Sequence, residues 1–512
     1  MSEQTIEVPP LERPPIARRA DDVPPRSASR DWLRTPLGLI RAHPWIFGGV
    51  LLLAISTVIV LWARVRPGYD PYGWLVWGHL TIHFKLNTNG APSWKPLPFV
   101  FTAPFNLVGH YALWLWMITS VAVSLAGVVF AWRIAFRLTD SPPERRYASY
   151  VAGLVAACAV LGIRDYTHFT LSAQSDPMIV SLCLAAIDCH LSRRYRWAFW
   201  MWLLASLGRP EVWPFLGLYV IWAWRAMPEL RRMIAAGGVL LLAFWFGIPA
   251  LTAKSPFIAG NLAKGSPREL HSNKFFGTID RFFDLHEMPV QLAALLAVVL
   301  AALRRQRTVL ILAAGAVLWV LIEAGFALHG WPAVPRYLFE PVAVMAVLAG
   351  VGIGRIVLEL PALFGRLGPR LTPQIAGALT AAVVVVFGLT MVPPARSRLR
   401  IERRDLTHER TRAQELNRLS TVVGRLGASR IFACGQPNIP IGYQSVLAWY
   451  LGSNVGELYF APKSQSFKLH PHPVVNMYPL RNGWKVFASH VANAATPSQR
   501  AACSHMHLTF KS

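Results

Sequence analysis

Long apolar runs alternate with short basic segments along most of this chain. About nine of the runs are close to the length that a helix needs to cross a bilayer. We expect these runs to be full membrane spans: Pro44–Ala63, Val108–Trp132, Tyr147–Ile163, Phe169–Leu191, Met233–Leu251, Val290–Leu303, Val309–Leu328, Leu338–Leu358 and Ile375–Val392. The pattern predicts a mostly α, polytopic transmembrane helical bundle.

Two further apolar stretches do not fit a simple span. Gly73–Phe84 is too short to cross and is expected to lie along the interface as an amphipathic helix. Trp197–Trp224 is interrupted by Arg209-Pro210-Glu211 and has basic residues at both ends. Roughly 28 residues are too few to cross a bilayer twice as full helices. We therefore predict a broken helical hairpin that lines a cavity, where non-helical backbone at membrane depth is tolerated.

The distribution of Arg and Lys between the runs predicts the topology. Residues 1–43 are rich in Pro, Arg and acidic residues and are expected to form a disordered cytoplasmic tail. Residues 44–392 form the transmembrane domain. By parity, residues 393–512 lie outside the cytoplasm, although the arginines that directly follow the last run argue against this.

The C-terminal region reads as a small α/β or α+β domain. We expect a helix at Leu406–Leu419, a strand at Ser429–Cys434, a helix at Val446–Leu451 and strands at Glu457–Phe460 and Trp484–Ala488. Cys434 and Cys503 fall in this polar region and can form a disulfide if it lies outside the cytoplasm. The domain contains no recognisable catalytic motif.

The amino-acid composition is typical of a membrane protein. The 512 residues are 54% hydrophobic and 15% charged, and 20 of them are Trp. The formal net charge of +25 comes from Lys and Arg that cluster between apolar runs, as topology signals and lipid headgroup contacts require. No nucleic-acid-binding motif accompanies this charge. We expect a multi-pass protein of the plasma membrane.

A loop with several candidate functional residues follows the first run, between Arg66 and Asn106. It contains Asp70, aromatic residues that include Tyr69 and Trp74, and then Lys95 in a proline-stiffened segment. A carboxylate, aromatic faces and a cation at one membrane surface favour chemistry on an amphiphilic, anionic substrate. The alternative is an ordinary interfacial loop with an aromatic belt.

Other polar groups stand at the ends of spans on the same expected side. Charges at membrane depth are costly, so they are usually paired and functional. The candidates for lining a site are Arg164, Asp165, His168, Asp176, Arg209, Glu211, His329, Arg336 and Tyr337. Glu323 and Glu340 are interpreted as helix-packing or interface residues, and Arg336 has the alternative of anchoring a helix end to lipid. The sequence shows no metal-ligand spacing, phosphate-binding glycine loop or nucleophile motif, so no metal or cofactor is expected.

Four segments together resemble the GT-C superfamily of polytopic glycosyltransferases, which use polyprenyl-phosphate-linked sugars. They are Gly68-Tyr69-Asp70 with Lys95-Pro96-Leu97-Pro98, the polar string Ser172–Asp176, Arg209-Pro210-Glu211, and Pro335-Arg336-Tyr337-Leu338. The resemblance implies a catalytic acidic residue at Asp70, with Asp165 as a second. It also implies donor-phosphate binding by Lys95, Arg164 and Arg336. Asp70 is followed by Pro71 rather than by a second acidic residue, which leaves a metal-dependent mechanism without support.

The expected function is therefore inverting glycosyl transfer at the outer membrane face. The sugar would move from a polyprenyl-phosphate donor to a glycan, lipid or protein acceptor of the cell envelope, with Asp70 as the base. A transporter or flippase of lipid-linked sugars is the alternative, since it also needs a polar cavity among broken helices. Transporters usually show internal repeats, and this sequence shows none between its halves.

Overall fold

The computed structural model describes residues 43–90, 92–264, 268–271, 273–367, 372–459, 473–491, 496–504 and 506–511. The expected cytoplasmic tail, residues 1–43, lies outside these ranges except for His43. The chain divides into two compact units, of which the first ends at Leu51 and contains only the start of α2 among the described residues. The elements that follow belong to the second unit.

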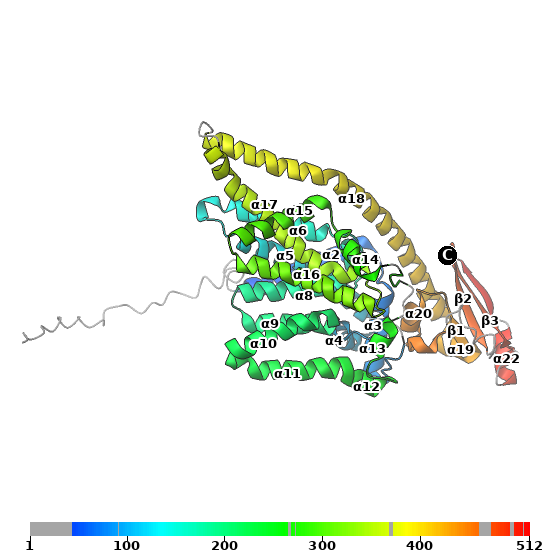
Figure 1. Cartoon of the computed structure of the whole chain (residues 1–512). Helices are drawn as coiled ribbons and strands as arrows, with labels where there is room; N and C mark the ends of the chain where they lie inside the picture. Colours follow the sequence, from blue (N-terminus) through cyan, green and yellow to red (C-terminus); the bar gives the residue numbers. More distant parts are fainter. Residues whose placement is uncertain are drawn as a thin grey trace, which may run out of the picture. The chain divides into compact units, whose positions relative to one another are not determined.

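The chain is mostly helical, and its apolar runs form the helices of a bundle (Figure 1). In the first part of the chain the helices are α2 (Pro44–Ala63), α3 (Tyr69–Ile82), α4 (Pro96–Phe105), α5 (Ala112–Thr139), α6 (Tyr147–Leu161), α7 (Tyr166–Leu171) and α8 (Asp176–Leu191). The later helices are α9 (Tyr195–Gly208), α10 (Trp213–Ala226), α11 (Arg231–Leu242), α12 (Ile248–Thr252), α13 (Ile258–Ala263), α14 (Lys274–Phe283), α15 (Met288–Leu303), α16 (Arg307–Leu328) and α17 (Phe339–Leu367).

Six segments of the described chain are long and apolar enough to cross a membrane, and seven if the bent pair α14–α15 counts as one span. Several apolar helices of this kind define a multi-pass membrane protein. The expectation of about nine full spans is not met, because α6 and α8 are shorter than a full span. Twelve of the sixteen residues of α8 are buried in protein. A helix surrounded by other helices does not need the full apolar length that lipid contact demands.

The predicted broken hairpin is present. Helix α9 ends at Gly208, Arg209 has an extended backbone, and a 3-10 turn (η4, Pro210–Val212) leads into α10. Pro210 lacks a backbone N–H and restricts the preceding residue to extended conformations, which ends the helix at this point. The break therefore places a charged side chain between two helices.

Helix α17 runs through the bundle between α6 and α15 (Figure 1). In its most apolar stretch, 83% of the residues are buried in protein. Two glycines allow this. A Cβ on Gly350 would lie 2.3 Å from the carbonyl oxygen of Ala152 on α6, and one on Gly352 would lie 2.1 Å from that of Ala293 on α15. Small residues at these positions let the helix backbones pack directly against one another.

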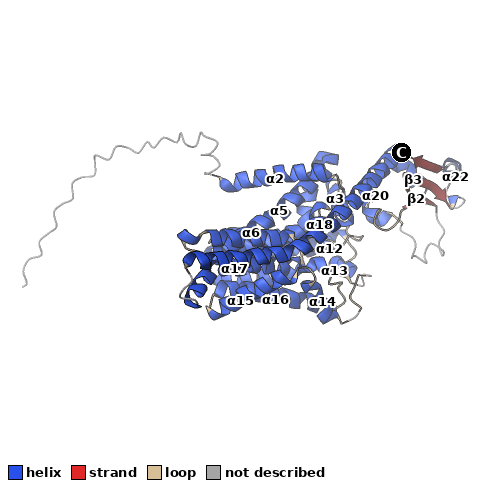
Figure 2. Ribbon diagram, turned by 90° about the horizontal axis from the view of Figure 1, so that it is seen from above, coloured by secondary structure: helices blue, strands red, loops and turns tan. Residues whose placement is uncertain are grey.

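The last long helix, α18 (Pro373–Leu426), leads into a small C-terminal domain with a four-stranded sheet of order β1-β2-β3-β4 (Figure 2). Its elements are α19 (Ala428–Cys434), β1 (Gln436–Asn438), α20 (Gln444–Leu451), β2 (Val474–Leu480), β3 (Gly483–Ser489), α22 (Pro497–Ser504) and β4 (His507–Lys511). β1 and β2 are parallel, and the other two pairs are antiparallel. A disulfide joins Cys434 to Cys503, the pair expected from the sequence.

Three expectations for this region are wrong. The strand expected at Glu457–Phe460 does not form in its described part, where Glu457 ends a 3-10 turn and Tyr459 makes a single β-bridge to Asn438. Ser429–Cys434 was expected as a strand and forms helix α19, because a short apolar run does not distinguish a strand from a helix. The expected separate helices at Ile375–Val392 and Leu406–Leu419 are parts of the single helix α18. Helix α20 and strand β3 agree with the prediction.

The C-terminal domain packs against α3, so α3 is not the interfacial helix that its length suggested. Nine of its fourteen residues are buried. The rings of Tyr72 and Tyr450 meet edge to face at 6.2 Å, and Asn454 Nδ2 donates to the backbone oxygen of Asn87 at 2.8 Å. The helix that carries Asp70 is thus held between the bundle and α20.

Candidate active site

Asp70 lies in the first turn of α3, where the free N–H groups and dipole of a helix favour a negative charge. The N–H of Gly68, just before the helix, donates to the oxygen of Ser172 at 3.0 Å and fixes the start of α3 against the end of α7. The Asp70 side chain is 23% exposed, and its Oδ2 lies 3.4 Å from Arg336 Nη2. The carboxylate is therefore oriented by a cation and still accessible.

Arg209, at the break between α9 and α10, forms the centre of a buried charge network. Its Nη2 pairs with Asp176 Oδ1 at the start of α8. Its Nη1 lies 3.9 Å from Glu211 Oε1, and its Nε lies 3.8 Å from Glu340 Oε1. The guanidinium also stacks over the ring of Tyr337 at 4.0 Å. This pairing is what allows the charge to be buried among helices.

Arg336 connects this network to Asp70. It lies in a 3-10 turn (η7, Pro335–Leu338) at the start of α17. Its two terminal nitrogens face different carboxylates, with Nη2 toward Asp70 and Nη1 3.9 Å from Asp176 Oδ2. The guanidinium also lies over the ring of Phe169 at 5.6 Å. The planar guanidinium therefore bridges an accessible carboxylate and a fully buried one.

Lys95 is a buried cation of this region that forms no ion pair or hydrogen bond with the described residues. It precedes α4, its ammonium group is buried, and it has no hydrogen-bond partner among the described residues. The ammonium group lies 5.9 Å from the ring of Trp74. Burial lowers the pKa of Lys95; Asp176 opposes the shift, and the guanidinium groups of Arg209 and Arg336 add to it. An anion bound beside Lys95 would supply the missing charge and the missing acceptors.

A cavity of about 1000 Å³ opens beside these charges. Its lining includes the polar side chains of Lys95, Arg209, Glu211 and Tyr337. It also includes several aromatic side chains, among them Trp213, Trp245, Phe246, Phe257 and Trp331. A volume of this size is at the upper end of the range for small-molecule sites.

The structure brings most of the expected site residues together. Arg209, Glu211, Tyr337 and Lys95 line the cavity, and Asp70, Asp176 and Arg336 belong to the adjoining charge network. Asp176 does not line the cavity as expected, because it is fully buried behind Arg209.

Other expected residues do not line the cavity. Trp74 is fully buried against Trp116, and Tyr69 lies beside Ser445 of α20. His329 is exposed, and its Nδ1 bonds the Gly325 oxygen at the end of its own helix. None of these lines the cavity.

The segment before and within α7 also lies apart from the cavity. Arg164 and Asp165 are exposed in the link to α7, and His168 faces α18, where it pairs with Asp405. The resemblance gave Asp165 a catalytic role and Arg164 a phosphate-binding role, and their exposed positions offer no support for either. The charge network forms without them.

Three participants were missed or misjudged from the sequence. Glu340 faces Arg209, and Glu323 lies beside Glu211, so both belong to the network rather than to plain helix packing. A carboxylate within an apolar run is energetically costly, and this cost was the feature of the sequence that could have indicated a functional role. Lys264 lines the cavity and lies over the ring of Trp331 at 4.6 Å. It stood in a long basic loop, where nothing in the sequence distinguished it from its neighbours.

No protein-family profile and no curated protein matches the sequence. Two solved structures of ArnT from Cupriavidus metallidurans are similar, one bound to undecaprenyl phosphate and one in the apo state. The first has a TM-score of 0.48 and 14% identity and covers 85% of this chain and 93% of ArnT. The second has a TM-score of 0.47 and 15% identity and covers 86% and 93%. ArnT is a GT-C glycosyltransferase that uses a polyprenyl-phosphate sugar, the class that the sequence resembles. TM-scores below 0.5 describe only a general likeness of fold.

Proposed function

We propose that this chain is an inverting membrane glycosyltransferase that takes its sugar from a polyprenyl-phosphate carrier. The observation that carries the proposal is the Lys95 ammonium group, which is buried beside a cavity and has no hydrogen-bond partner among the described residues. A buried cation without an acceptor is costly, and the phosphodiester that joins a sugar to a lipid carrier supplies both charge and acceptor oxygens. The aromatic wall suits a sugar ring and an isoprenoid chain.

Asp70 is the base in this proposal. As the acceptor hydroxyl oxygen forms its bond to the anomeric carbon, its proton passes to the Asp70 carboxylate. The bond between the anomeric carbon and the phosphate oxygen breaks, and the polyprenyl phosphate leaves with the electron pair. Lys95 stabilises the charge that develops on that phosphate. A single displacement of this kind inverts the anomeric configuration.

Arg336 acquires a different role from the one that the resemblance implied. Its two terminal nitrogens face the carboxylates of Asp70 and Asp176, while its Nε has no hydrogen-bond partner among the described residues. We assign it to positioning Asp70, and we assign the phosphate to Lys95. Lys264, on the same cavity, is the second cation within reach of an anionic headgroup.

The carrier is of the same chemical class as the undecaprenyl phosphate in the ArnT structure. The acceptor is proposed to be a glycan, lipid or protein of the cell envelope, with the reaction at the extracytoplasmic face of the plasma membrane. A transporter of lipid-linked sugars would also use a cationic site within the membrane. It would not need the accessible, oriented carboxylate of Asp70.

Binding of undecaprenyl phosphate to the purified chain in lipid nanodiscs tests this proposal without knowledge of the sugar. Lys95→Met keeps the length of the side chain and removes its charge. We expect binding to weaken by about 1.5–3 kcal/mol, the range for a charged hydrogen bond, which is roughly tenfold to more than a hundredfold in Kd. Lys85→Met, on an exposed lysine of the same loop, is the matched control and should bind like the wild type. Equal binding by Lys95→Met and the wild type would remove Lys95 from the phosphate site.

A further inference from the structure

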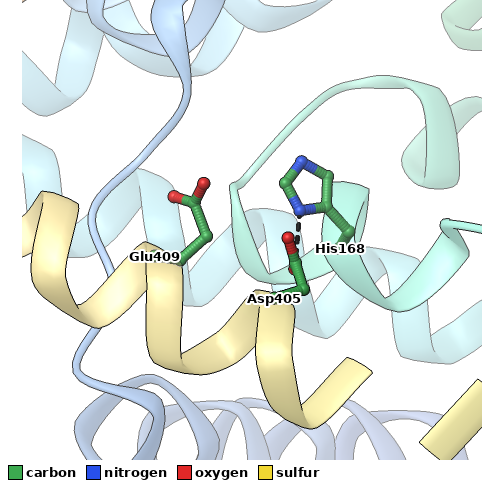
Figure 3. Close-up of side chains that lie close together, drawn as sticks. All are labelled: His168, Asp405 and Glu409. Carbon is green, nitrogen blue, oxygen red and sulfur yellow. Dashed lines mark hydrogen bonds and ion pairs between the residues drawn. The ribbon is translucent and has the colours of Figure 1, made fainter. Parts of the chain in front are cut away.

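A second group of chemically active side chains lies where α7 meets α18 (Figure 3). His168 comes from α7, and Asp405 and Glu409 are one turn apart on α18. One ligand atom from each residue lies within 4.8 Å of the other two, and His168 Nδ1 is 2.8 Å from Asp405 Oδ2. All three residues are half-buried, so solvent still reaches the group.

Further acidic side chains lie near this group. Glu402, one turn earlier on α18, interacts electrostatically with both Asp405 and Asp165. Of the six arginines between residues 398 and 412 of α18, Arg398 and Arg412 form ion pairs with glutamates. Arg398 pairs with Glu287 at 2.9 Å. Arg412 pairs with Glu409 Oε2 at 3.3 Å and also donates to the oxygen of Pro67. One oxygen of Glu409 therefore stays available for a further cation.

We propose that His168, Asp405 and Glu409 bind a divalent transition-metal ion with zinc or manganese chemistry. Two carboxylates and one imidazole form a mixed oxygen and nitrogen donor set, which such ions prefer over the all-oxygen sets of calcium and magnesium. Three protein ligands at a half-buried position leave room for water to complete the coordination. The ion would displace the proton shared between His168 and Asp405.

The position of the group gives the ion a structural task rather than a chemical one. Phe169, next to His168, lies beneath the Arg336 guanidinium, and Ser172 at the end of α7 accepts the N–H of Gly68 just before α3. Helix α18 continues from the group into the C-terminal domain. An ion at this point would tie the C-terminal part of the chain to the loop that positions Arg336 and Asp70. The proposal holds whether or not the chain transfers sugars.

No spacing of ligands along the chain could reveal this site, since His168 and Asp405 are 237 positions apart. An ordinary ion pair between His168 and Asp405 is the competing interpretation. The two interpretations differ in whether Glu409 matters and whether added metal changes the protein.

The test uses the full chain, purified with a tag that contains no histidine and stripped with EDTA. Titration calorimetry with ZnCl₂ and with MnCl₂, and elemental analysis of the bound metal, should give one ion per chain. His168→Ala and Glu409→Gln should each weaken binding at least tenfold and abolish the rise in melting temperature that the ion produces. His408→Ala, on the exposed face of the same helix, should behave like the wild type.

Glu409→Gln leaves the His168–Asp405 pair intact, so it keeps the proposal falsifiable even if His168→Ala does not fold. Unchanged affinity in Glu409→Gln would overturn the proposal and leave an ordinary ion pair. The dissociation constants of protein zinc sites are typically far below about 100 μM. Failure of the wild type to bind either ion at a metal concentration of about 100 μM would therefore also overturn the proposal.

Discussion

Arg336 lies at the junction between the accessible carboxylate of Asp70 and the buried one of Asp176. The two residues of the first contact are 266 positions apart, and no sequence spacing relates them. Their charges were nevertheless conspicuous, because each stood at the edge of an apolar run. The pairing itself came only from the fold, and it is the reason why we propose a positioning role for Arg336 instead of phosphate binding.

Arg336→Lys tests this assignment. An ammonium group cannot face two carboxylates in the fixed geometry of a guanidinium, so Asp70 should lose its orientation. We expect glycosyl transfer to fall at least tenfold, while the Kd for undecaprenyl phosphate changes less than threefold. Arg400→Lys, at an exposed position of α18, is the control. A tenfold or greater loss of undecaprenyl phosphate binding in Arg336→Lys would return Arg336 to the phosphate site.

At the scale of single residues, the sequence located the cluster but not its full membership. Asp70, Lys95, Arg209 and Arg336 were all candidates. Glu323 and Glu340 were interpreted as packing residues, because a lone carboxylate in an apolar helix does not show which neighbour it faces. The distinction depends on the rotation of the helix, which only tertiary packing determines.

Among the elements, α17 depends most on small residues. Gly352→Ala adds a methyl group where the carbonyl oxygen of Ala293 would lie 2.1 Å away, so α15 and α17 must separate. We expect a loss of about 1–3 kcal/mol in stability, the usual cost of overpacking, measured as a lower melting temperature in detergent. Gly377→Ala on α18 is the control, because no atom lies within 4 Å of the added Cβ there. An equal melting temperature for Gly352→Ala and the wild type would contradict the close packing.

The pattern of apolar runs predicted the helices well, since burial in lipid or protein demands apolar side chains. Its failures have physical causes. Helix α18 continues past its apolar segment because arginine and glutamate are good helix formers in water, so a change of polarity does not end a helix. Helix α8 starts late because the polar string before it is not helical, and Ala173 within it has a positive φ of 56°. Hydrophobicity alone therefore predicts neither the end of α18 nor the start of α8.

At the scale of the molecule, the distribution of basic loops predicts the orientation in the membrane. In a background with Cys158, Cys183 and Cys189 changed to Ser, we would place single cysteines by Arg305→Cys and Arg481→Cys. A membrane-impermeant thiol reagent added to intact cells should label position 481, in the turn between β2 and β3, and should reach position 305 only after permeabilisation. Labelling of 305 but not of 481 in intact cells would reverse the topology and move the proposed site to the cytoplasmic side.

The most direct test of glycosyl transfer compares chemistry with binding in Asp70→Asn. The variant keeps the size and hydrogen bonding of the side chain but removes the base. With a panel of undecaprenyl-phosphate sugars and membranes that contain the acceptor, we expect transfer to fall about a hundredfold or more. The affinity for undecaprenyl phosphate should stay within threefold of the wild type, because Lys95 is unchanged. Asp284→Asn, an exposed carboxylate of another loop, serves as the control. Transfer by Asp70→Asn within a few-fold of the wild type would contradict the account.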